Sequence, residues 1–156
     1  INAIFSSDLK RAKDTAYYIK ANNDYFMMYL PELREMSFGD WEGLTISQVQ
    51  SDYKEQFDNF EKNPIIYDNK GGENFETLIK RVSDGLSKIT DLGFENSLIV
   101  THGITVKALQ TILEKRSLSD ISKLPVITGC SLIGYEIEGS NIKKFLQDDK
   151  YDFVPK

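Results

Sequence analysis

Cysteine and histidine each occur only once among the 156 residues of this sequence. The lone Cys130 excludes a disulfide within the chain and is typical of a reducing compartment, so we expect a cytoplasmic location. Because His102 is the only histidine, all imidazole chemistry within these residues depends on that one side chain.

Long apolar runs and an excess of basic residues are also lacking. The longest uncharged stretch, residues 124–135, is too short to cross a bilayer and contains Pro125, Gly129 and Gly134. A net charge of -5 argues against a nucleic-acid-binding surface. We therefore expect neither a nucleic acid nor a membrane as partner, and an anionic ligand would need cationic side chains gathered in one pocket.

The residues that are present describe an ordinary folded domain. Apolar residues make up 40% and charged residues 28% of the chain, which is typical of globular proteins. Residues 1–156 form one domain in this interpretation. Because the sequence opens on Ile1, within a strand-like segment, we expect the domain to be truncated at its N-terminus.

Short apolar runs alternate with segments of helical periodicity along the chain. Strands are predicted at 3–5, 26–30, 97–101, 131–137 and 142–146, and helices at 9–21, 45–57, 75–89 and after residue 103. We expect the strand at 26–30 to be buried. The alternation predicts a three-layer α/β fold, with a mostly parallel sheet, helices on both faces and an antiparallel C-terminal hairpin at the edge.

Polar residues follow two of the predicted parallel strands, at Ser6 to Arg11 and at Thr101 to Gly103. Ligands of such sheets bind beyond the carboxyl ends of the strands, so these residues are expected to converge. His102 alone would be read as a solvated loop histidine. Its position before Gly103, at the start of a helix, favours an anion site instead, where the backbone can approach the ligand closely.

Arg11 and Glu35 are the next candidates for chemistry. Arg11 would by default pair with Asp8 or Asp14 at the surface, but its planar fork is also suited to grip a phosphate. Glu35, in the loop from Leu33 to Gly43, can protonate the departing alcohol of a phosphate ester, although a loop ion pair with Arg34 is the alternative.

For two further loop residues, Trp41 and Glu73, a structural role is expected. Trp41 is more consistent with a packing anchor than with a substrate contact. Glu73, in Gly71-Gly72-Glu73, lies at the start of the strongest predicted helix, where a carboxylate is stabilised by the helix dipole. A place for Glu73 on the rim of the pocket is the functional alternative.

Four segments, in this order, resemble the short phosphatase branch of the histidine phosphatase (phosphoglycerate mutase-like) superfamily: residues 5–12 with Thr15-Ala16, residues 33–43, residues 71–73 and residues 100–103. The resemblance implies hydrolysis of a phosphomonoester through a phosphohistidine, with no metal or cofactor. It implies that Arg11 binds the phosphate with Ser6, Gly103 and Glu73 around the substrate, that His102 is the second catalytic histidine, and that Glu35 is the proton donor.

The family's nucleophile lies in an arginine-histidine-glycine motif that this sequence does not contain. The resemblance therefore implies that the family's first strand and helix lie upstream, and that these residues alone are inactive. The alternatives are a non-catalytic phosphoester-binding module, an inactive paralogue or a phosphoglycerate mutase. The short segment of residues 44–70 favours a phosphatase over a mutase. The implied substrate is a small phosphorylated metabolite, with α-ribazole phosphate as the candidate and a homodimer left open.

Overall fold

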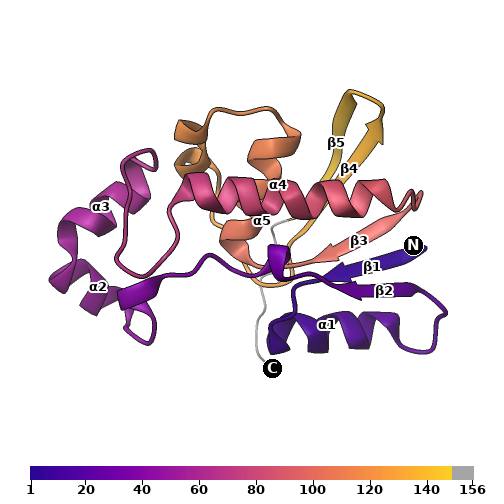
Figure 1. Cartoon of the computed structure of the whole chain (residues 1–156), viewed down its shortest axis with the longest axis horizontal. Helices are drawn as coiled ribbons and strands as arrows, with labels where there is room; N and C mark the ends of the chain where they lie inside the picture. The colour runs from indigo at the N-terminus through magenta and orange to yellow at the C-terminus, as the bar shows by residue number, and fades with distance from the viewer. Residues whose placement is uncertain (149–156) are drawn as a thin grey trace.

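The computed structural model of the chain describes residues 1–148. Figure 1 shows a small parallel sheet with helices on either side and a separate hairpin. The elements are β1 (Ala3–Ser6), α1 (Lys10–Lys20), β2 (Phe26–Tyr29), η1 (Pro31–Leu33), η2 (Gly39–Trp41), α2 (Ile46–Asp52), α3 (Lys54–Lys62), α4 (Phe75–Asp91), β3 (Ser97–Val100), α5 (Gly103–Leu113), η3 (Leu118–Lys123), β4 (Leu132–Glu138) and β5 (Asn141–Asp148).

The parallel sheet has the order β2-β1-β3, with β1 in the centre. All four residues of β1 are buried, because helix α1 covers one face and helices α4 and α5 cover the other (Figure 1). The predicted α/β class with helices on both faces is confirmed. The carboxyl ends of β1 and β3 lie together, since Ser6 pairs with Val100.

Strand β2 forms an edge of this sheet, and the prediction that it is buried was wrong. Phe26, Met28 and Tyr29 are exposed. An apolar run four residues long does not distinguish an edge strand from a central one, because the distinction depends on what packs against it. Only Leu30, directly after the strand, is buried.

The C-terminal hairpin is confirmed as antiparallel, but it does not join the parallel sheet. Strands β4 and β5 pair with each other in a sheet of their own. Within residues 1–148, no strand pairs with the second edge of β3. That edge therefore remains open along Leu98 to Val100.

The predicted helix at 45–57 is two helices. The capping box formed by Thr45 and Gln48 starts α2 as expected. Tyr53 then leaves the helical conformation, with φ -129° and ψ 39°, and α3 begins at Lys54. The break brings the rings of Tyr53 and Phe57 within 6.4 Å and 6.2 Å of Trp41, centre to centre.

The larger core lies between this helical pair and helices α4 and α5. Trp41 is 6% exposed and is surrounded by aromatic rings, which confirms its predicted role as a packing anchor. Leu78 and Val82 contribute the buried stripe of α4, as its periodicity predicts. None of the helices within residues 1–148 combines the length and the apolar character needed to span a membrane.

Candidate functional site

His102 lies at the carboxyl end of β3, where its ring is held on both sides. Arg11 donates from Nε to His102 Nδ1 at 3.1 Å, and His102 Nε2 lies 2.8 Å from the hydroxyl of Ser7. Arg11 comes from the first turn of α1, and Ser7 directly follows β1. The parallel pairing of β1 with β3 therefore brings these three side chains together, as the sequence predicted for Arg11 and His102.

The two contacts determine the protonation of the imidazole. Because Nδ1 accepts from a guanidinium, the proton of the neutral ring belongs on Nε2, which then donates to Ser7 Oγ. Burial lowers the pKa of His102, and the positive charge of Arg11 lowers it further against the opposing effect of Glu35. His102 is thus a neutral donor at neutral pH.

Arg11 is exposed, and only its Nε is engaged. Its two terminal nitrogens make no hydrogen bond within residues 1–148, and the residue lines a pocket. The alternative pairing with Asp8 or Asp14 does not form. Asp8 instead accepts two hydrogen bonds of 2.6 Å from Arg34, and Asp14 pairs with Lys10.

Glu35 lies against the first turn of α5, directly beyond His102. Its Oε1 accepts from the backbone N–H of Met36 at 3.0 Å and of Thr105 at 3.2 Å, and its Oε2 accepts from the N–H of Ile104 at 3.3 Å. The helix N-terminus therefore holds a protein carboxylate, not a free anion as we expected. The alternative ion pair of Glu35 with Arg34 is absent, because Arg34 is bound to Asp8.

Ser6 and Gly103 occupy different positions relative to this cluster. Ser6 is fully buried, and its hydroxyl donates to the carbonyl of Ser7. The serine that contacts His102 is Ser7, not Ser6. Gly103 lies beside Glu35 and lines a pocket. A Cβ at Gly103 would lie 3.6 Å or more from other protein atoms. Packing within the protein therefore does not require glycine at this position.

Glu73 binds the loop that carries Glu35, through a partner that sequence reasoning missed. Arg81 of α4 donates to both carboxylate oxygens of Glu73 at 2.7 Å. Its Nη1 also donates to the carbonyls of Glu32 at 2.8 Å and Arg34 at 3.1 Å. Arg81 is eight residues after Glu73 in the sequence. The periodicity of the helix did not identify Arg81 as a site residue, because the backbone carbonyls that it binds belong to a loop far away in the sequence.

The pair formed by Glu73 and Arg81 holds this loop on both sides of Glu35. Glu73 accepts from the N–H of Ser37 at 3.0 Å, and its own N–H donates to the Ser37 carbonyl at 2.9 Å. Burial raises the pKa of Glu73, but the hydrogen bonds from Arg81 and Ser37 outweigh it and leave the pKa below its usual value. The pair is therefore charged and fixes the backbone that presents Glu35.

The glycines of this region allow the two loops to meet backbone to backbone. Gly39 has φ +50°, and a Cβ there would lie 2.3 Å from the carbonyl oxygen of Lys70. A Cβ on Gly72 would lie 2.7 Å from the Ser37 carbonyl oxygen. Only glycine fits at either position, which explains Gly39 and the glycine directly before Glu73.

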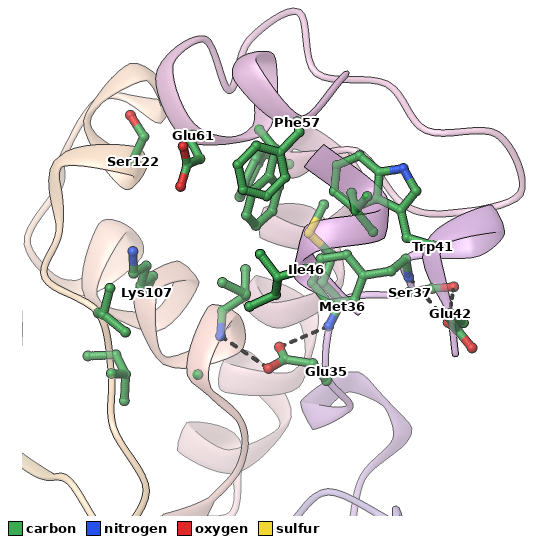
Figure 2. Close-up of a pocket in the computed structure, with 18 of the residues that line it drawn as sticks. Glu35, Met36, Ser37, Trp41, Glu42, Ile46, Phe57, Glu61, Lys107 and Ser122 are labelled. Atoms are coloured by element: carbon green, nitrogen blue, oxygen red, sulfur yellow. Dashed lines mark hydrogen bonds between the residues drawn. The ribbon is translucent and has the colours of Figure 1, made fainter. Parts of the chain in front are cut away.

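A pocket of about 1140 Å³ extends from the cluster toward the helical pair; we call it the main pocket. Arg11, Glu35 and Gly103 line its inner end. Figure 2 shows Glu35 with its hydrogen bonds at one edge, Phe57 and Trp41 along one wall, and Lys107 on another side. No group of three or more acidic, histidine or cysteine side chains in residues 1–148 is placed to hold a metal ion.

Comparisons with known proteins agree with the fold and with the segments that suggested the family. The model of the histidine phosphatase superfamily (branch 1) matches residues 1–148. A metal-independent phosphoserine phosphatase of Arabidopsis thaliana is 34% identical over 111 residues, which are 69% of this chain and 46% of that protein. The chain spans about half the length of the curated relatives that it matches.

Solved structures are similar over nearly the whole chain. YhfR of Bacillus stearothermophilus has a TM-score of 0.85 at 28% identity, covering 92% of this chain and 72% of that one. The α-ribazole phosphatase of Shigella flexneri has a TM-score of 0.79 at 24% identity, covering 94% and 72%. The second likeness is one of fold alone.

Proposed function

The chain belongs to the histidine phosphatase superfamily, and from that premise we propose that the complete protein hydrolyses small phosphomonoesters. One observation carries the proposal. Arg11 and Glu35, from separate segments, both line the main pocket. His102 is hydrogen-bonded to Arg11 and directly precedes Gly103, another lining residue, and the two terminal guanidinium nitrogens of Arg11 are free of protein partners within residues 1–148. This arrangement supports a site that combines positive charge, a neutral donor and a carboxylate.

The roles follow from the chemistry of each group. Arg11 takes two phosphate oxygens with its terminal nitrogens. The Nε2–H of His102 turns from Ser7 to a phosphate oxygen and stabilises the charge that develops there. Glu35, once protonated, gives its proton to the departing alcohol. Ser6 supports the backbone beside Ser7, Gly103 leaves room for the ester, and Glu73 holds the loop of Glu35.

The nucleophile is proposed to be a second histidine outside these 156 residues. Its nitrogen bonds to phosphorus as the ester P–O bond breaks, and water then cleaves the P–N bond to release phosphate. His102 is the only histidine here and already contacts both Arg11 and Ser7. The second edge of β3 supports the proposal, because no strand within residues 1–148 pairs with it and a further strand can hydrogen-bond there, next to His102.

The substrate is proposed to be a small phosphorylated metabolite, and the reaction is proposed to need no metal. The relative from Arabidopsis thaliana, named as metal-independent and as acting on phosphoserine, supports both parts. α-Ribazole phosphate stays a candidate, with support only from the shared fold. A cytoplasmic location is proposed from the single cysteine.

The direct test is turnover of p-nitrophenyl phosphate in the presence of a chelator. The protein in its full natural length should hydrolyse this ester and pass through an acid-labile phosphoenzyme, whereas the 156 residues alone should not. Turnover by the 156 residues would overturn the assignment of the nucleophile. A full-length protein that binds phosphate without turnover would favour the non-catalytic binding module instead.

A further inference from the structure

The outer part of the main pocket contains a cation that no group within residues 1–148 neutralises. Lys107 lies on α5 and lines the pocket, and its amine makes no hydrogen bond or ion pair within residues 1–148. The side chain is half-buried, and burial lowers the pKa of its amine. A partly desolvated charge is unfavourable unless an opposite charge lies beside it, so such a group is typical of a ligand-binding position.

The position of Lys107 relates it to the phosphate end of the pocket. Gly103 and Lys107 are four residues apart on the same face of α5, a rise of about 6 Å. Both line the main pocket, and Ile104 lies between them in the wall. A ligand with its phosphate at Arg11 and His102 can therefore extend along one turn of α5 and place a second group at Lys107.

The walls around Lys107 restrict what that second group carries. Between the two ends the pocket is mainly apolar, with Ile46, Phe57 and Val126 among its lining residues. Glu61 and Ser122 line the pocket near its outer side (Figure 2). A single lysine in a pocket that also contains a carboxylate suits a singly charged anion better than a second phosphate, which calls for several donors or an arginine fork.

We propose that Lys107 binds a carboxylate on the organic part of the substrate, so that the preferred esters are phosphorylated organic acids with a short apolar body. This rests on the proposed function, which places the phosphate at the inner end of the pocket. Contact with a group remote from the reacting phosphorus strengthens binding of the ground state and transition state alike, so it acts on KM and leaves kcat unchanged.

The test uses two inert probes that match in shape and differ in charge, para-carboxyphenylphosphonate and para-carbamoylphenylphosphonate. Calorimetry on the full-length protein should show about tenfold tighter binding of the carboxylate, equivalent to about 1.4 kcal/mol. Lys107→Met should abolish this preference while the carbamoyl probe keeps its affinity within about twofold. Lys107→Arg should retain most of the preference.

Lys123→Met is the matched control, because Lys123 is a nearby cation that pairs with Asp120 and does not line the pocket. It should leave both affinities unchanged. Equal binding of the two probes by the natural protein, or an equal loss of both in Lys107→Met, would overturn the inference.

Hydrolysis of the corresponding phosphate esters separates this inference from the proposed function. Turnover of both esters with equal KM would remove Lys107 from recognition and leave the phosphatase standing. A carboxylate preference in binding without turnover would support Lys107 and refute the hydrolase. Failure of both probes to bind would overturn both proposals.

Discussion

Two regions of the main pocket are built differently. At the inner end, Arg11 is hydrogen-bonded to His102 at 3.1 Å, and Glu35 accepts from backbone N–H groups at 3.0–3.3 Å. In the apolar part of the pocket, Ile46 is 70% exposed and Val126 is 78% exposed. A bonded network fixes geometry, whereas exposed apolar side chains adapt to what they contact. We therefore expect chemistry to depend on the first region and substrate choice on the second.

The largest expected effect is at His102. His102→Gln should lower kcat of the full-length protein by roughly 10²–10³, because a donor aimed at developing charge is lost. Ile46→Ala, in the exposed apolar part of the pocket, should change kcat by less than about twofold. Steady-state kinetics on p-nitrophenyl phosphate checks both. A loss below about tenfold in His102→Gln would mean that the inner end is not where the chemistry occurs.

Glu35→Gln should have the next largest effect, and the effect should depend on the leaving group. Esters of poorly acidic alcohols should slow by roughly 10², since an alkoxide needs the proton. p-Nitrophenyl phosphate, whose leaving group is stable as an anion, should slow by less than about tenfold. Equal slowing of both esters would leave Glu35 a structural contact of α5 and remove it from proton transfer.

A smaller effect is expected from the pair that holds the loop of Glu35. Arg81→Lys retains the charge but loses the fork that binds Glu73 and two backbone carbonyls, so kcat should fall by about tenfold with KM nearly unchanged. Lys80→Met, at the exposed neighbour that pairs with Asp84, is the control and should be neutral. The leaving-group dependence of Arg81→Lys should match that of Glu35→Gln. A thermal melt should show Arg81→Lys still folded at the assay temperature.

The smallest expected effect is a pH dependence of stability. The pKa of His102 is lower in the folded chain than its usual value of 6.5, so the unfolded chain binds a proton more readily. The free energy of unfolding of the 156-residue chain should therefore fall as pH drops below about 6.5. Urea titrations at several pH values should show this slope in the natural sequence and a reduced slope in His102→Gln. Identical slopes would contradict the assigned burial of a neutral imidazole.

Sequence reasoning predicted the features that depend on local pattern. The periodicity of residues 75–89 gave α4, the capping box at Thr45 gave the start of α2, and the positions at the strand ends gave the contact of Arg11 with His102. It could not predict what depends on distant contacts. Ser7 and Arg81 enter the site only through partners far along the chain, and nothing in residues 26–30 shows that β2 is an edge.

The same limit applies to the break at Tyr53 and to the hairpin. The helical pattern continues through Tyr53, and the turn there serves the packing around Trp41. The sequence of residues 131–146 is enough to predict a hairpin. Whether that hairpin joins another sheet depends on the remaining strands, which its own sequence does not reveal. The local pattern therefore predicted the hairpin but missed the break at Tyr53, which depends on packing with residues far along the chain.

Because the Glu35 loop is attached to α4, the site is complete only after this helix has packed during folding. Arg81 reaches the loop only after α4 has docked, and Gly39 and Gly72 meet only when both loops have closed. A chain that has formed its parallel sheet but not seated this helix would hold Arg11 and His102 without a positioned carboxylate. The ability to position Glu35 would then be gained late in folding, when α4 docks. It would be lost early in unfolding, when α4 detaches.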